Sequence, residues 1–136
     1  MHESDSRHLS VVVAAAPATV YATARDLARL PEWAAGLAAR ELRIIDDATV
    51  ELDSLMGRVR VEFSVRNELG VLDHTVTLPD GSVTDNPLRV VAHPHGAELI
   101  FTVRRGASPS EEFDRDCEMV AADLRQLARL AEQSVS

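Results

Sequence analysis

The 136-residue sequence is poor in several residue types that mark particular classes of protein. It contains one cysteine, Cys117, no lysine, and only 4% aromatic residues. A single cysteine cannot close an internal disulfide, so nothing in the sequence requires an oxidising compartment. The longest apolar run, residues 11–18, contains Pro17 and is too short to cross a bilayer, and residues 1–10 lack the basic and apolar segments of a signal peptide. We therefore expect a soluble cytoplasmic protein.

What the sequence does contain is enough aliphatic material for one core. Hydrophobic residues make up 46% of it, and 19 Ala, 16 Val and 15 Leu supply most of them. A chain of this size typically forms one domain that buries roughly two-thirds of its unfolded surface. We expect residues 1–136 to form a single domain with residues 1–8 as a flexible tail. The net charge of −8 repels nucleic acids and anionic membranes, so neither is expected as a partner.

The N-terminal part is predicted to form a strand followed by two short helices. Residues 9–16 are rich in valine, which favours a strand, and Pro17 suits the first position of a helix. Apolar residues then recur every three or four positions from Val20 to Ala28, as on one face of a helix. The sequence Leu30-Pro31-Glu32-Trp33 ends this pattern, and a second helical turn follows up to Gly36. Trp33 is placed to cap one end of the core or of a cavity.

A long C-terminal helix is the clearest predicted element. Ser108-Pro109-Ser110-Glu111 has the pattern of a capping box with proline at the first helical position. An apolar stripe follows at spacings of three and four residues, formed by Phe113, Cys117, Val120, Leu124, Leu127 and Ala131. Cys117 lies within this stripe, which favours a buried, inert thiol over a nucleophile. The acidic residues between positions 111 and 118 lie mostly off the stripe and are interpreted as a solvated face.

Between Glu41 and Arg105 the period changes to two residues, as in antiparallel strands joined by tight turns. Residues 43–46 and 49–53 form a predicted hairpin, and residues 58–66 alternate strictly between apolar and polar side chains. Matching the apolar faces across a turn at Glu68-Leu69 pairs Val65 with Leu72, Phe63 with His74, Val61 with Val76 and Val59 with Leu78. The following turns set His74 against Asn86, Leu72 against Leu88, Leu88 against Phe101, and Asn86 against Val103.

One row across the predicted sheet therefore reads Phe63, His74, Asn86 and Val103, on the face that the C-terminal helix should cover. Polar groups on such a face need partners or water. His74 and Asn86 either bond each other within a closed core or present donors and acceptors to a ligand in a cavity. Asp73 cannot orient the imidazole, because adjacent residues of a strand point to opposite faces.

Signals for other chemistry are weak. His93-Pro94-His95 offers two potential metal ligands, but no cysteine or carboxylate motif completes a site, so neither a metal nor a cofactor is expected. The sequence contains no nucleotide-binding glycine loop and no spacing typical of a serine-histidine-aspartate triad.

The order of predicted elements and three segments of sequence resemble a known superfamily. The segments are VVVAAAPATVYATARDLARLPEW at positions 11–33, NELGVLDH at positions 67–74 and NPLRV at positions 86–90. They are similar to the START-like (SRPBCC) superfamily, which includes polyketide cyclases and dehydratases and Bet v 1-like proteins, and within it to a small bacterial polyketide cyclase/dehydrase-like subgroup. The resemblance implies an α+β helix-grip fold, in which a curved antiparallel sheet of about seven strands wraps around the C-terminal helix. It also implies a cavity between the two for an apolar molecule.

Three hypotheses follow for function. The first is binding of a small, largely apolar molecule, with aromatic and polyketide-like compounds as candidates, between the sheet and the C-terminal helix. The second is a cyclase or dehydratase in which His74 moves a proton and Asn86 positions a carbonyl or hydroxyl. The third is a closed core whose face acts only in homodimerisation. The residues predicted to bind a ligand are Trp33, Phe63, Leu72, His74, Asn86, Leu88, Phe101, Val103, Cys117, Val120 and Leu124.

Overall fold

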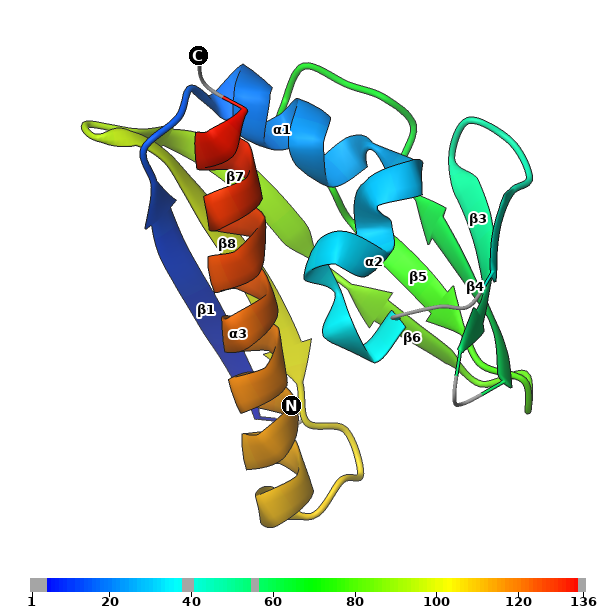
Figure 1. Cartoon of the computed structure of the whole chain (residues 1–136). Coiled ribbons are helices and arrows are strands. Elements are labelled where there is room, and N and C mark those ends of the chain that lie inside the picture. The colour runs from blue at the N-terminus through cyan, green and yellow to red at the C-terminus, as the bar shows by residue number, and fades with distance from the viewer. Residues whose placement is uncertain (1–4, 38–40, 55–56, 135–136) are drawn as a thin grey trace.

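The computed structural model describes residues 5–37, 41–54 and 57–134. One strand comes first, short helices follow it, and a run of seven strands leads to a long C-terminal helix (Figure 1). The N-terminal elements are β1 (Ser6–Val13), α1 (Pro17–Arg25), the 3-10 turn η1 (Leu27–Arg29), α2 (Leu30–Trp33) and the 3-10 turn η2 (Ala35–Leu37). The strands that follow are β2 (Glu41–Ile44), β3 (Thr49–Ser54), β4 (Gly57–Phe63), β5 (His74–Thr77), β6 (Val83–Asn86), β7 (Leu88–His93) and β8 (Gly96–Arg104). The chain then forms the C-terminal helix α3 (Ser110–Gln133).

The strands form two antiparallel sheets that meet at Pro87. One sheet has the order β2-β3-β4-β5-β6, and the other has the order β1-β8-β7. Proline has no N–H to donate to a ladder, so the chain leaves the first sheet at Asn86 and enters the second at Leu88. The described residues therefore contain eight strands, where about seven were expected, because the predicted strand through positions 84–92 is divided here.

Helix α3 lies along β1 and β8, and α1 and α2 pack beside it (Figure 1). Its predicted apolar stripe faces the sheet, with Phe113, Cys117, Leu124, Leu127 and Ala131 buried and Val120 half-buried. The predicted α+β helix-grip arrangement is thus confirmed. No helix in the described ranges combines the length and apolar character needed to cross a membrane.

The predicted register of the central strands is confirmed. Phe63 is opposite His74 and Val61 opposite Val76, and His74 in turn is opposite Asn86. The strict alternation of β4 explains this accuracy, because a slip of one residue would move every buried side chain to solvent.

The loop after β4 differs from the prediction. Val65 does not pair with Leu72, because β4 ends at Phe63 and the Val65 side chain is 78% exposed. The side chain of Asn67 instead folds the loop on itself by donating to the carbonyls of residues 65 and 71 and accepting from the N–H groups of residues 69 and 71. Gly70 accepts from Val90 N, Leu72 donates to the carbonyl of Leu88, and Val71 forms an antiparallel bridge with Arg89. This loop therefore pairs beside β7 and does not continue β4.

Two predicted boundaries are also wrong. Ser6 to His8 were expected in a flexible tail, but they pair with β8 as part of β1, while residues 1–4 lie outside the described part. Pro109, not Ser108, occupies the N-cap of α3 and provides no side-chain bond, so the predicted capping box does not form. Ser108 instead accepts a hydrogen bond from Arg105 Nε through its carbonyl (3.0 Å), which holds the preceding turn.

Candidate functional site

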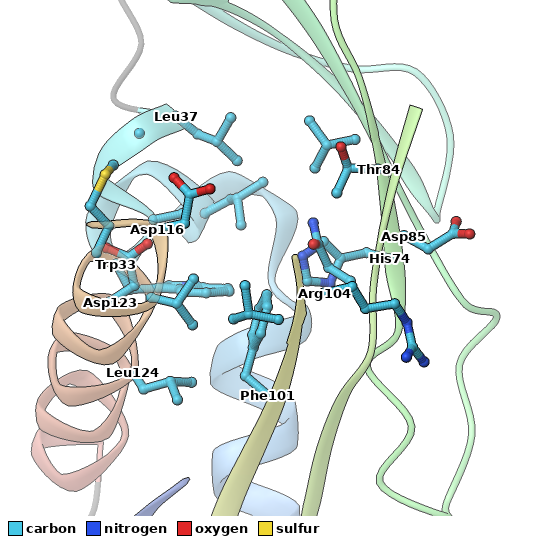
Figure 2. A pocket seen from close by; sticks show the side chains of 18 residues that line it. Trp33, Leu37, His74, Thr84, Asp85, Phe101, Arg104, Asp116, Asp123 and Leu124 are labelled. Carbon is cyan, nitrogen blue, oxygen red and sulfur yellow. The ribbon is translucent and has the colours of Figure 1, made fainter. Parts of the chain in front are cut away.

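A cavity of about 300 Å³ lies between the sheets on one side and α2, η2 and α3 on the other. Its sheet wall is formed by His74, Val76, Thr84, Asp85, Asn86, Phe101, Val103 and Arg104. Its helical wall is formed by Leu30, Trp33, Ala34, Gly36, Leu37, Asp116, Met119, Val120, Asp123 and Leu124. Figure 2 shows the two walls facing each other, with Trp33 and Leu124 across from Phe101 and His74. The third hypothesis, a closed core between helix and sheet, is therefore wrong in this region.

The split between the two sheets explains where this cavity lies. Asn86 ends β6 and Val103 lies on β8, and no strand pairing in the described part joins these two strands. The predicted pairing of Asn86 with Val103 is thus wrong, although both side chains line the same cavity. The cavity lies beside this break in the ladder, with α3 on its other side.

His74 is the most deeply placed ionisable group of the sheet wall. Its side chain is 8% exposed, and its Nδ1 lies 3.0 Å from the carbonyl oxygen of Leu72. A carbonyl only accepts, so Nδ1 carries the hydrogen and, in the neutral ring, Nε2 carries a lone pair. Burial lowers the pKa of His74 below 6.5, although the bond to Leu72 and the charge of Asp73 oppose this shift. The site therefore offers a neutral imidazole.

The Nε2 atom of His74 has no hydrogen-bond partner among the described residues, and it is not sealed from the cavity. The expected bond between His74 and Asn86 does not form, although the two residues lie opposite each other in the ladder. A ligand hydroxyl or N–H could donate to this lone pair. The geometry thus supplies one acceptor at a defined position in an otherwise mostly apolar wall.

Aromatic contacts fix the orientation of the imidazole. The ring lies 4.8 Å from the Phe63 ring in a tilted arrangement and 6.0 Å from the Phe101 ring edge-on. Phe63 is in turn contacted by the guanidinium of Arg25, whose Cζ lies 5.5 Å from the ring centroid. Asp73 points to the other face of the sheet, where it binds Arg89 (2.7 Å) and accepts from Leu88 N, as strand alternation predicts.

Arg25 is fully buried at the end of α1, and the sequence analysis did not single it out. It donates through Nη1 to the carbonyl of Asp47 (2.8 Å) and through Nη2 to the carbonyl of Ser64 (3.3 Å). These bonds tie α1 to the turn before β3 and to the end of β4. No local signal marks such a residue, because its partners lie 22 and 39 positions away.

The helical wall carries two carboxylates: Asp116, which was predicted on a solvated face and is exposed, and Asp123, which the sequence analysis did not consider. Asp123 is half-buried and accepts a hydrogen bond from Ala35 N (3.2 Å), at the start of η2. Burial raises the pKa of Asp123 above 3.8, and the bond from Ala35 opposes this shift only in part. Asp116 lies two helical turns earlier on the same wall. The sequence signal for this wall was the spacing of seven residues between Asp116 and Asp123, which places both beside Val120 and Leu124 of the apolar stripe.

The cavity brings together most of the predicted binding residues but not all. Those that line it are Trp33, His74, Asn86, Phe101, Val103, Val120 and Leu124. Phe63, Leu72, Leu88 and Cys117 are buried in the surrounding core and lie outside the lining. Phe63 still contacts His74, so its place is behind the wall rather than on it.

Solved structures with this arrangement of elements are known. The Zhui aromatase/cyclase from a Streptomyces species matches with a TM-score of 0.70 and 17% identity, over 98% of this chain and 97% of that one. Ara h 8.0201 matches with a TM-score of 0.71 and 10% identity, over 97% and 100% of the two chains. The chain has the Bet v 1-like helix-grip fold. This helix-grip fold is also found in DynU16, a protein of the dynemicin biosynthetic locus, with a TM-score of 0.72 and 17% identity over 94% of this chain and 47% of that one.

These likenesses establish the helix-grip fold and no activity, since all three identities are below one residue in five. No protein-family model and no curated protein matches the sequence.

Proposed function

We propose that this chain binds a small, largely apolar molecule, with aromatic and polyketide-like compounds as the leading candidates, in the cavity between the sheets and α3. The observation that carries the proposal is the buried His74 imidazole, whose Nε2 meets no partner in the described residues and borders a cavity of about 300 Å³. A volume of this size lies at the lower end of small-molecule sites. An unused acceptor in such a wall costs free energy unless a ligand or water bonds to it.

The lining also suits a flat, rigid ligand. Phe101, Trp33, Leu124 and Val103 provide apolar surface on both walls, and Asn86 adds a side-chain amide near the imidazole. A planar ring system can contact these surfaces while one hydroxyl donates to Nε2 of His74. One of the structural neighbours, the Zhui protein, is an aromatase/cyclase, which supports this choice of compound class.

A matched pair of ligands tests the proposal. We expect 2-naphthol, which has a hydroxyl to donate, to raise the melting temperature and to bind more tightly than 2-methoxynaphthalene, which has none. A ligand present at 100 times its Kd stabilises the folded state by about 2.7 kcal/mol, which a thermal shift detects readily. The His74→Leu variant should bind both compounds equally, because the acceptor is gone while the apolar wall remains.

Thr75→Val is the matched control, because Thr75 is the next residue of β5 and faces the opposite side of the sheet. It should leave the preference for 2-naphthol unchanged. Absence of saturable binding by either compound would count against a binding function. An unchanged preference in His74→Leu would assign His74 a purely structural role.

A second candidate function is proton transfer by His74 in a cyclase or dehydratase. The neutral ring with an unpartnered Nε2 favours it, because a general base needs that lone pair within reach of the substrate. Removal of His74 should then lower turnover of a polyketide intermediate by at least ~10²-fold while substrate still binds. Tight binding of the intermediate without turnover in the wild type would exclude this catalytic function and leave ligand binding as the function.

A further inference from the structure

The helical wall of the cavity carries two carboxylates that the proposed function does not use. Asp116 and Asp123 are seven residues apart on α3, so they lie on the same face of the helix, and both line the cavity. Figure 2 shows both side chains on the side of α3 that looks toward the sheet wall. Neither lies within 4.0 Å of a basic group in the described ranges, and Ala35 N is the one hydrogen-bond donor found there for Asp123.

Arg104, on the sheet wall, does not neutralise the two carboxylates of the helical wall. Arg104 is the only arginine among the lining residues that the structure describes, and its Nη1 bonds to Ser6 Oγ (3.3 Å) on β1. In Figure 2 its guanidinium points away from α3, as does the carboxylate of Asp85. The chain has no lysine that could approach instead. The helical side of the cavity therefore carries negative charge that no described basic residue of the lining neutralises.

One buried side chain of the same cavity shows that this is more than a solvated helix face. His74 is 8% exposed, and its Nε2, which bonds to no described residue, opens onto the cavity that the carboxylates line. Such an acceptor on a mostly apolar wall is satisfied by a ligand group or by water. The two carboxylates thus border a place where a ligand is expected.

Electrostatics then distinguishes between kinds of ligand. A half-buried carboxylate with a single hydrogen bond has lost part of its hydration without full compensation, as the raised pKa of Asp123 also indicates. A cation at this wall would restore that compensation through a charge-assisted hydrogen bond. An anion would meet two carboxylates inside a chain of net charge −8.

We propose that the ligand of this cavity carries a protonated amine, placed against Asp116 and Asp123, with its apolar body toward Phe101 and His74. This inference rests on the proposed binding function, because it names the ligand class for the same cavity. The amine and a hydroxyl directed to Nε2 of His74 would give the ligand two polar anchors on opposite walls. The cavity would then select a small aromatic or alicyclic amine over neutral and acidic compounds of the same shape.

Three probes with one apolar body test the inference by isothermal titration calorimetry on the full chain. They are 2-naphthylmethylamine, which is cationic near pH 7, the neutral 2-naphthylmethanol, and the anionic 2-naphthoate. We expect the amine to bind roughly 10-fold more tightly than the alcohol, which corresponds to about 1.4 kcal/mol, and 2-naphthoate to bind more weakly than either. Added salt should weaken the binding of the amine and leave the affinity for the alcohol unchanged.

Variants separate a local effect from net charge. Asp123→Asn and Asp116→Asn should each reduce the preference for the amine over the alcohol. Asp116 is exposed, so its variant should fold as the wild type does. Glu118→Gln removes the same charge from the exposed part of α3 outside the lining, and should leave the preference unchanged.

The outcomes are distinct. Binding of the alcohol at least as tight as that of the amine overturns the inference but leaves the proposed binding function in place. An equal loss of preference in Glu118→Gln and Asp123→Asn also overturns it, because the selectivity would then come from net charge. If none of the three probes binds, both the inference and the proposed function fail.

Discussion

Acidification between pH 7 and 5 should destabilise the fold through one side chain, His74. In the unfolded chain an imidazole takes up a proton near pH 6.5, whereas burial keeps the folded pKa of His74 below that value. Its contribution to the free energy of unfolding is therefore complete above pH 6.5 and is lost as the pH falls toward the folded pKa. Within that window the loss is about 1.4 kcal/mol per pH unit, because the unfolded state binds one more proton. For a domain of this size that corresponds to a fall in Tm of roughly 3–6 °C per pH unit.

Thermal unfolding followed by circular dichroism, at several pH values between 7.5 and 5, measures this effect in the wild type and in His74→Gln. The variant should show a flatter dependence of Tm on pH. The pKa values of Asp46 and Asp73 are lowered by their hydrogen bonds, so their stabilising effect disappears only below about pH 4. Burial raises the pKa of Asp123, which acts in the opposite direction as the pH falls, but both proteins contain it. Identical slopes for the two proteins between pH 6.5 and 5 would refute the reasoning.

Three further changes test parts of the fold that hold the site. Gly70 has φ of +77°, and a β-carbon at this position would collide with the carbonyl oxygen of Val90. Gly70→Ala should therefore lower the free energy of unfolding, measured by urea denaturation, by roughly 2–4 kcal/mol. Gly106, with φ of +58° and open space around it, is the control, and Gly106→Ala should cost only about 1 kcal/mol; equal losses would contradict a steric role for Gly70. Arg25→Met removes a fully buried guanidinium that donates to the carbonyls of Asp47 and Ser64, and should lower the free energy of unfolding by about 3 kcal/mol in the same assay. A loss below about 1 kcal/mol would show that water replaces the guanidinium. Trp33→Phe should cost less than about 1 kcal/mol despite its burial, because it also removes an unpaired N–H, and a loss typical of a large core truncation would mean that this N–H is paired in solution.

The pairing of the strands that carry the site could be predicted because the alternation of apolar and polar residues allows only one register. β4 buries Val59, Val61 and Phe63 and exposes the residues between them, so only one register with β5 matches the apolar faces. That register fixed His74 opposite Phe63 on the inner face, and the structure confirms both positions. The placement of Asp73 on the outer face followed from the same rule and is also confirmed.

Periodicity failed where tertiary contacts override it. Residues 64–66 continue the alternation of β4, yet Asn67 and Gly70 draw the chain toward β7 and leave Val65 in solvent. The side-chain bonds of Asn67 satisfy four backbone groups at once, and no pattern of hydrophobicity reports such a network. Arg25 was missed for a related reason, since its burial depends on carbonyls that two distant turns supply.

The acidic wall was missed because charged residues of a helix were assigned to solvent by default. That assignment holds when the apolar stripe of the helix is fully covered, as it is near Leu127 and Ala131. It does not hold near Asp123, where the sheets separate at Pro87 and α3 faces a hollow instead of side chains. The break in the ladder and the half-buried Asp123 thus border the same cavity, although they lie far apart in the sequence. The unpartnered Nε2 of His74 on one wall and the half-buried carboxylate on the other both border this cavity, whose place depends on how distant segments pack and not on any local pattern.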